Sequence, residues 1–200
     1  MRALFFLSVL FAAAAGAGPG SALDLTLPDG AVLTREIRED PGSYVAPVGP
    51  FADGVLPGTE IEGAILRQAW RFEAPGKTSL QILEPLRDQI DAAGYDIVFE
   101  CQGQSCGGFD FRFNIQVMSA PDLFVDLFDF RFLTARRAEG QAAPDYVTVL
   151  VSRPTHDGYI QIIRALPDGA GSAGTIGPGK PAATKAKASP GPLDDVADAL

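Results

Sequence analysis

The alternation of apolar and polar side chains after residue 22 predicts a domain built mainly from β-strands. Strand-like runs cover residues 23–27, 61–72, 95–101, 146–152 and 159–165. Turn-forming residues at 153–158 separate the last two runs, so we expect those two strands to form a hairpin. Residues 28–58 are rich in proline and glycine, which predicts a segment that wraps over the domain surface.

One stretch has the spacing of a helix instead. Its apolar positions are Leu80, Leu83, Leu86, Ile90 and Ala93. Thr78 suits the N-cap position, and Gly94 suits a left-handed residue at the end. Pro85 interrupts the pattern, and because an interior proline costs a helix about 3 kcal/mol, we expect a kink or a helix that begins nearer Glu84. The element order predicts an α+β fold, with one main helix on a largely antiparallel sheet of about five strands.

A five-residue segment occurs twice. Phe109-Asp110-Phe111-Arg112-Phe113 is repeated as Phe128-Asp129-Phe130-Arg131-Phe132. In a strand, each copy places three phenylalanines on one face and the Asp–Arg pair on the other. We expect the two copies to pair as antiparallel strands across a turn near residues 120–122. An exposed aromatic platform for a ligand is the alternative, but six exposed phenylalanines would promote aggregation, so core packing is favoured.

The first residues have the layout of a secretory signal peptide. Met1-Arg2 supplies a positive start, a predominantly apolar run extends from Ala3 to Ala15, and small residues follow up to Ala22. The apolar run is shorter than the roughly 20 residues that a membrane-spanning helix needs. We therefore predict cleavage after Ala22 and export of the chain. A retained, buried helix is the alternative that this layout disfavours.

Export determines how the two cysteines are interpreted. Cys101 and Cys106 enclose four polar, turn-prone residues, and neighbouring cysteines in an oxidising compartment usually form a bridge. A redox-active pair is the alternative. Thiol oxidoreductases space their cysteines by two residues, and we expect no helix after Cys101 to lower its pKa. The pattern thus predicts a structural disulfide.

The character of the chain changes after residue 166. Residues 167–192 consist largely of Gly, Ala, Pro, Ser and Lys, a composition that predicts a flexible, disordered linker. Residues 193–200 have the pattern of the start of an amphipathic helix. We expect residues 1–22 to be the signal peptide and residues 23–166 to form the folded domain, with a second domain that normally follows residue 200.

Composition limits the chemistry. The chain of 200 residues carries 16 basic and 25 acidic side chains, a net charge of −9, which argues against nucleic acid or an anionic lipid surface as the main partner. One histidine and two cysteines leave little material for a zinc site or a nucleophilic triad. We therefore assign no catalytic, cofactor-binding or metal-binding residue.

Three weaker motifs do not qualify as sites. Gly174 to Lys180 has the spacing of a phosphate-binding loop, but Pro181 stands where a Ser or Thr must hold magnesium. His156 and Asp157 suggest a catalytic pair but fall in the predicted hairpin turn. Asp122, Asp126 and Asp129 offer oxygens for calcium without the spacing or glycine of an EF-hand loop.

Three segments resemble a known family. Residues 80–89, 92–101 and 106–113 are similar to the N-terminal region of OmpA-family envelope proteins of Gram-negative bacteria, and the likeness extends over residues 23–166. A related uncharacterised domain with the same layout occurs in other exported proteins. In the OmpA family a Pro/Ala-rich linker leads to a C-terminal domain that binds peptidoglycan. This sequence lacks that domain, so the resemblance implies a location in the periplasm or at the outer membrane and no binding residues.

These observations predict a non-enzymatic, exported cell-envelope protein that serves as an interaction or structural module in the periplasm. Its contact with peptidoglycan would depend on the missing C-terminal domain. A periplasmic module that binds a small ligand through its phenylalanine faces is the alternative. An exported enzyme built on His156 ranks third.

Overall fold

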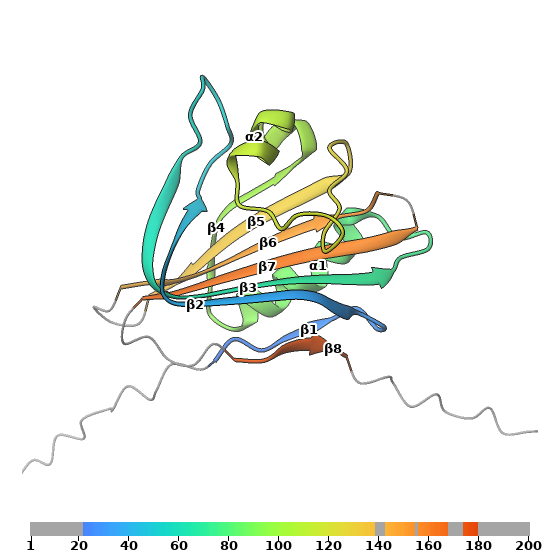
Figure 1. Ribbon diagram of the computed structural model, residues 1–200, viewed down its shortest axis with the longest axis horizontal. Coiled ribbons are helices and arrows are strands. Elements are labelled where there is room, and N and C mark those ends of the chain that lie inside the picture. Colours follow the sequence, from blue (N-terminus) through green and yellow to red (C-terminus); the bar gives the residue numbers. More distant parts are fainter. Residues whose placement is uncertain (1–21, 139–142, 155, 168–173, 180–200) are drawn as a thin grey trace, which may run out of the picture.

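A curved six-stranded sheet is the centre of the fold (Figure 1). The computed structural model describes residues 22–138, 143–154, 156–167 and 174–179. Its elements are β1 (Leu25–Leu27), β2 (Val32–Pro47), β3 (Gly58–Glu73), α1 (Ser79–Ala92), β4 (Asp96–Gln102), the 3-10 helix η1 (Gly103–Cys106), α2 (Gly108–Asn114), β5 (Phe130–Arg137), β6 (Asp145–Ser152), β7 (Asp157–Pro167) and β8 (Ile176–Pro178). The strand order in the sheet is β2-β3-β7-β6-β5-β4, and every neighbouring pair is antiparallel. The predicted α+β class is confirmed, with six strands in the sheet.

The strand β2 was not expected from the sequence. It occupies most of the proline- and glycine-rich segment that was predicted to wrap over the surface, and that prediction is wrong. The β2 strand lies at an edge of the sheet, so most of its side chains are exposed and it has no regular apolar alternation. Its pairing with β3 shifts register between Leu33 and Arg35 and again between Glu39 and Gly42. Pro41 falls within the second shift, where an edge strand tolerates a proline.

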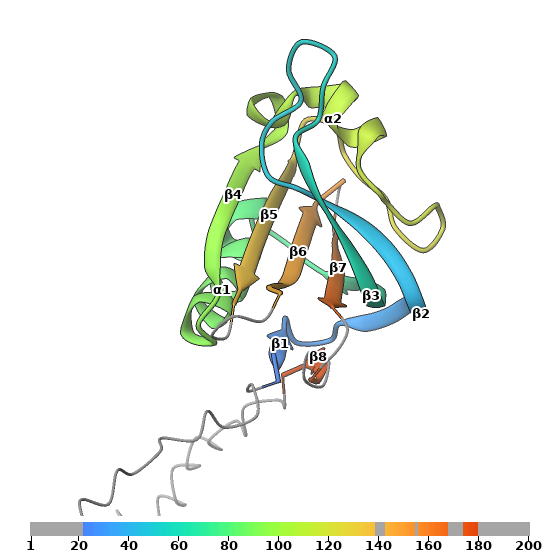
Figure 2. The same cartoon turned by 90° about the vertical axis from the view of Figure 1, so that its left-hand side faces the viewer.

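The outer parts of β2 and β3, residues 42–62, form an arm that bends over one face of the sheet (Figure 2). The bend begins where the pairing of β3 with β7 ends, at Gly63 opposite Pro167. A Cβ atom at Gly63 would lie 2.2 Å from the carbonyl oxygen of Leu166, and its φ is +142°. Only glycine permits this close approach. The arm then buries apolar residues against the sheet, namely Tyr44, Ala46 and Ile61 with Tyr146, Ile163 and Ala165.

The helix α1 covers the opposite face. Thr78 is its N-cap, and a capping box with Gln81 is formed by backbone-to-side-chain bonds of 3.2 and 2.9 Å. The predicted cap is therefore confirmed. The helix begins at Ser79 and contains Pro85, so the expected start near Glu84 is wrong. The capping box and the packing of the helix on the sheet offset the hydrogen bond that Pro85 removes.

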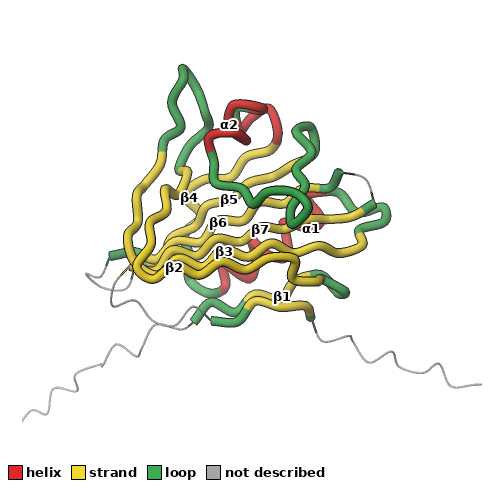
Figure 3. Tube along the Cα trace, in the orientation of Figure 1, coloured by secondary structure: helices red, strands yellow, loops and turns green. Residues whose placement is uncertain are grey.

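The buried face of α1 differs in one position from the expected one. Leu80 is 36% exposed, whereas Ile82 is buried together with Leu83, Leu86 and Ile90. These side chains join the large apolar cluster on this face of the sheet. Gly94 has a φ of +81° directly after the helix, as expected. Figure 3 shows α1 behind the strands, with α2 beside the arm.

The two copies of the repeated pentapeptide do not pair as strands, which corrects that expectation. The first copy lies in α2, where Phe111 is buried while Phe109 and Phe113, one helical turn apart, are 59% and 63% exposed. The second copy enters β5 only at Phe130. Three of the six phenylalanines, Phe109, Phe113 and Phe128, are thus exposed, so their expected core packing is wrong.

The chain context explains the different structures of the identical segments. Two glycines with positive φ, Gly107 and Gly108, precede the first copy and redirect the chain from η1 into a helix. The second copy leads into a central part of the sheet, and Phe132 pairs with Cys101 on one side and with Leu150 on the other. Tertiary pairing therefore overrides any local preference of the segment.

The short strands β1 and β8 form a separate parallel pair below α1 (Figure 1). Ile176 of β8 is buried, and a Cβ atom at Gly174 would lie 2.2 Å from the backbone oxygen of Leu23. The expectation of a linker from residue 167 is therefore corrected at residues 174–179. Residues 1–21 of the predicted signal peptide (1–22), residues 168–173 and 180–192 of the predicted linker, and residues 193–200 lie outside the described residues. No helix among the described residues is long and apolar enough to cross a membrane.

Candidate functional site

An open groove of about 700 Å³ lies between β2 and the irregular segment that follows α2. The side chains of β2, β3 and β7 form one wall and the floor, and residues 115–122 form the other wall. The lining consists of Arg35, Ile37, Glu39, Arg67, Ile115, Gln116, Val117, Met118, Ser119, Asp122 and Gln161. Its volume lies within the range of small-ligand pockets, about 300–1,000 Å³.

The first register shift of β2 determines which of its side chains line the groove. Arg35 pairs with Ala69 after the shift, and the alternation of the strand then directs Arg35, Ile37 and Glu39 to one face. Before the shift, the side chains of even-numbered residues such as Val32 point to this same face. An extra residue in one strand is a common device for redirecting side chains next to a site.

Gln161 of β7 attaches the irregular wall to the floor of the groove. Its side chain is buried, with Oε1 accepting the backbone N–H of Met118 at 2.7 Å. Its Nε2 donates to the backbone oxygen of Gln116 at 2.8 Å. This side-chain amide therefore bonds residues 116–118 as a neighbouring strand would, and it holds an otherwise irregular segment in place.

The charged side chains of the lining fall into two classes. Arg67 donates to Glu39 at 2.7 Å, to Gln116 at 3.2 Å and to the backbone oxygen of Ser43 at 3.2 Å. Within the described part of the chain, neither the guanidinium of Arg35 nor the carboxylate of Asp122 takes part in a hydrogen bond or an ion pair. The groove therefore has one neutralised pair and two separate charges of opposite sign.

The disulfide lies at the far end of the arm. Cys101 and Cys106 are bonded with a Cα–Cα distance of 5.1 Å, which confirms the predicted bridge. The expectation that no helix follows Cys101 is wrong, because the chain forms η1 and then α2. Both cysteines are buried, and the backbone N–H of Phe51 in the arm loop donates to the oxygen of Cys106 at 2.8 Å. The disulfide loop thus anchors the tip of the arm.

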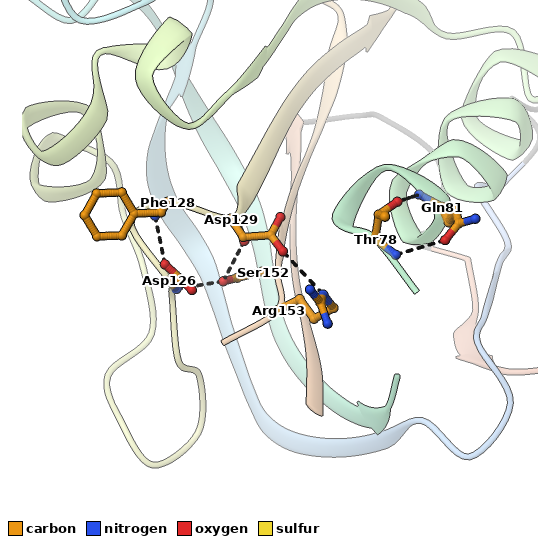
Figure 4. Close-up of polar contacts among 7 residues, drawn as sticks. All are labelled: Thr78, Gln81, Asp126, Phe128, Asp129, Ser152 and Arg153. Atoms are coloured by element: carbon orange, nitrogen blue, oxygen red, sulfur yellow. Dashed lines mark hydrogen bonds and ion pairs between the residues drawn. The ribbon is translucent and has the colours of Figure 1, made fainter. Parts of the chain in front are cut away.

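Three phenylalanines of the repeated pentapeptide are exposed and lie outside the core. The rings of Phe109 and Phe113 on α2 are 4.3 Å apart, and the guanidinium of Arg112 lies 5.5 Å from the ring centre of Phe113. Phe128 is 84% exposed, and its backbone N–H donates to Oδ1 of Asp126 at 2.8 Å (Figure 4). Ring exposure is therefore limited to three of the six phenylalanines of the repeat.

Two of the three aspartates that were considered for calcium, Asp126 and Asp129, bond within the loop before β5. The hydroxyl of Ser152 accepts the backbone N–H of Asp126 at 2.8 Å and donates to the backbone oxygen of Asp129 at 3.3 Å (Figure 4). Arg153 donates to the carboxylate of Asp129 at 3.3 Å. The residues that the structure describes contain no cluster of three or more His, Cys, Asp or Glu that could hold a metal ion.

His156 lies in the turn of the β6–β7 hairpin, as the sequence predicted. Its side chain is exposed, and its backbone oxygen accepts the N–H of Ala74 at 2.9 Å. The neighbouring Asp157 contacts Arg71 at 3.4 Å. In the segment with phosphate-loop spacing, Ile176–Pro178 form β8.

No protein-family model matches the chain, and no curated protein matches it. The likeness to OmpA-family proteins therefore remains a prediction from residues 80–113. Sequence reasoning missed the groove, because residues 35–39 fall in the segment that was predicted to wrap over the surface. The only local signal was the run of alternating charges from Arg35 to Glu39, which is typical of an exposed edge strand.

Proposed function

We propose that the chain is an exported, non-enzymatic module of the cell envelope that binds a partner or ligand in the groove beside β2. The observation that carries this proposal is the groove itself, with an anchored wall and two unpaired charges on an otherwise neutralised lining. Preformed concave sites with a few placed polar groups are the usual form of a ligand site. The signal-peptide pattern of residues 1–22 and the likeness of residues 80–113 support the location in the envelope.

Three polar side chains of the groove are engaged in holding its walls and are not free for bond-making chemistry. Gln161 and Arg67 already use their polar atoms to hold the groove walls, and Glu39 is engaged with Arg67. A general base needs a free acceptor within hydrogen-bond reach of its substrate. These side chains are therefore suited to maintaining the shape of the site.

A second candidate function is the binding of a small apolar ligand by the exposed aromatic residues. The observation that favours it is the Phe109–Phe113 ring pair on the outer face of α2. Exposed apolar side chains that lie side by side often mark an interaction surface. The double variant Phe109→Ala/Phe113→Ala would lose such binding, while the groove variants described next would keep it.

The groove proposal is tested by hydrogen exchange on the full chain expressed in a Gram-negative host and purified from its periplasmic fraction. Mass spectrometry first checks whether the mature chain begins at Leu23. Exchange of the backbone amides of residues 115–122 is then measured with and without a soluble extract of envelope components. We expect the extract to slow this exchange. Ser119→Trp, which places a large side chain in the groove, abolishes the effect.

Asp88→Trp is the matched control, because Asp88 is exposed on the outer side of α1 and away from the groove. This variant keeps the protection that the extract confers. Unchanged exchange of residues 115–122 in the wild-type protein, or equal protection in the Ser119→Trp variant, would show that the groove is not a binding site. A precursor that retains residues 1–22 in the cytosol would refute export.

A further inference from the structure

The groove and the disulfide belong to one apolar cluster. Both cysteines are members of the cluster that also contains Ile115 and Met118 of the groove lining. We propose that the groove is redox-gated: its irregular wall, residues 115–122, stays in place only while the Cys101–Cys106 bond is closed. This inference rests on the proposed function above, because it concerns the regulation of the same site.

The irregular wall belongs to a part of the chain that has little regular support. Residues 103–129, all of them described, contain η1 and α2 and no strand. The helix α2 has only seven residues, and no side-chain hydrogen bond caps its N-terminus. A helix of that length is not stable in water by itself. The position of α2, and of the wall that follows it, therefore depends on how this segment is attached to the rest of the domain.

The disulfide attaches the start of this segment to the sheet. Cys101 lies in β4 and pairs with Phe132 of β5, whereas Cys106 is the last residue of η1. The bond thus fixes the point from which the chain turns through two glycines with positive φ into α2. The turn is closely packed, since a Cβ atom at Gly107 would lie 2.6 Å from the backbone oxygen of Phe51 in the arm loop. Opening the bond releases this turn and, with it, the orientation of α2.

The helix α2 connects the turn to the wall of the groove. The side chain of Phe111 is fully buried, and its ring centre lies 5.2 Å from that of Phe132 in β5. The backbone N–H of Ile115, the first residue of the wall, donates to the oxygen of Phe111 at 3.1 Å. A displaced α2 removes Phe111 from the cluster, and Ile115 moves with it. The groove then loses both its shape and part of its apolar lining.

Hydrogen bonds also hold the wall from the side of the sheet. The side-chain amide of Gln161 bonds the wall in two places, and Thr34 donates to the backbone oxygen of Asp122 at 2.7 Å. A hydrogen bond contributes less to net stability than the full burial of a phenylalanine side chain does. These bonds alone are therefore insufficient to keep the wall closed once Phe111 has left the cluster.

Thiol–disulfide exchange supplies the redox step. A reducing dithiol attacks the sulfur of Cys101, which is 8% exposed whereas Cys106 is fully buried, and the S–S bond breaks. The dithiol loses two protons and two electrons and becomes a disulfide, while the two cysteines gain them as thiols. Oxidation is the reverse reaction, with a disulfide as the oxidant. An oxidising compartment therefore closes the wall and a reducing one leaves it open, so that binding is confined to the oxidising compartment.

The test compares the oxidised and the reduced chain by amide hydrogen exchange, resolved residue by residue with NMR and without any extract. Excess dithiothreitol reduces the chain that was purified from the periplasmic fraction. The amides of Ile115 and Met118 are the probes, because both are hydrogen-bonded in the wall. We expect reduction to accelerate their exchange at least about tenfold more than that of the bonded amides of β6 and β7. Reoxidation with glutathione disulfide restores slow exchange.

Two variants separate the gate from a general loss of stability. Cys101→Ser/Cys106→Ser has a fast-exchanging wall both with and without dithiothreitol. Gln89→Ala is the matched control, because Gln89 of α1 bonds the backbone of Thr26 outside the groove lining. This variant weakens the fold without touching the disulfide, so it should not selectively accelerate the exchange of the wall.

Equal acceleration in the wall and in β6 and β7 would make the bond a general staple and overturn this inference. So would unchanged exchange of the wall, unfolding of the whole chain on reduction, or an opening that reoxidation does not reverse. None of these results decides the proposed function, which depends on the extract experiment with Ser119→Trp in the oxidised chain. A chain that shows extract-dependent protection but keeps its wall closed after reduction retains the binding function and loses the redox gate.

Discussion

The side-chain amide of Gln89 bonds both backbone groups of Thr26. Its Oε1 accepts the N–H of Thr26 at 2.7 Å, and its Nε2 donates to the oxygen of the same residue at 3.1 Å and to that of Pro85 at 2.8 Å. A residue of α1 thus bonds to β1 as a neighbouring strand would, on the side of β1 that does not pair with β8. This contact joins the two-stranded β1–β8 unit to the main domain.

We expect Gln89→Ala to destabilise the folded chain by about 1 kcal/mol. The variant removes two hydrogen bonds to Thr26, and water partly replaces them because the site is exposed. Urea denaturation followed by circular dichroism measures the change. Asp88→Ala on the outer face of the same helix is the control and should change stability by less than about 0.5 kcal/mol. Equal stability of both variants would show that the Gln89 bonds contribute nothing.

Reduction of the Cys101–Cys106 bond should lower the free energy of unfolding by about 2 kcal/mol. The loop that the bond closes is short, so its removal releases less entropy in the unfolded chain than a long loop would. Denaturation with and without a phosphine reductant measures the difference. The backbone N–H of Phe51 donates to the oxygen of Cys106. Reduction should therefore accelerate the hydrogen exchange of the Phe51 amide more than that of the amides in the central strands. A uniform acceleration would contradict a local role for the disulfide.

Gly63→Ala should destabilise the chain by more than about 2 kcal/mol and loosen the arm. The new Cβ atom would lie 2.2 Å from the oxygen of Leu166, and the residue has a positive φ. Gly54→Ala is a matched control, because Gly54 also has a positive φ but a Cβ atom there would have no heavy atom within 4 Å. That variant measures the cost of a side chain at a positive φ without a steric clash, about 1 kcal/mol. Similar losses in the two proteins would refute the steric role of Leu166.

Stability should decrease between about pH 10 and pH 12. Burial, together with the hydrogen bond to Asp145, raises the pKa of Tyr95 to about 12, above its ordinary value of 10. The contribution of the neutral phenol is therefore complete below pH 10. It is lost as the pH rises through the folded-state pKa, because the unfolded chain releases this proton first.

The pH prediction is checked by urea denaturation at several pH values in the wild-type protein and in Tyr95→Phe. The variant should lose part of the pH dependence. Burial also raises the pKa of Tyr44, so some dependence should remain. Identical profiles for the two proteins would exclude Tyr95 as a source of the effect.

Local sequence signals were sufficient to predict the elements that bury one face and expose the other. The alternation of residues 61–72 predicted β3, and the side chains of Thr78 and Gln81 form the cap expected at the start of α1. The two cysteines were paired correctly from their close spacing across four polar, turn-prone residues together with the predicted export of the chain. For the strand and the cap, the information needed lies within a few residues of the element itself.

The groove was decided by contacts between distant residues. The side chains of Arg35 and Asp122 are brought to one cavity by the register shift of β2 and by the bond from Gln161 to Met118. The hydroxyl of Thr34 also lies 2.7 Å from the backbone oxygen of Asp122. Neither a register shift nor a side-chain bond between residues far apart in the chain leaves a periodic signal in the sequence.

The sequence by itself determined the α+β class, the disulfide and the helix cap, because periodicity, spacing and capping are local properties of the chain. Only the tertiary structure decided that one copy of Phe-Asp-Phe-Arg-Phe is a helix and that the other leads into a strand. It also decided that β2 is a strand and that its arm bends at Gly63. The physical reason is that strand pairing and burial are satisfied by partners far along the chain, and their combined free energy exceeds the small local preferences of each segment.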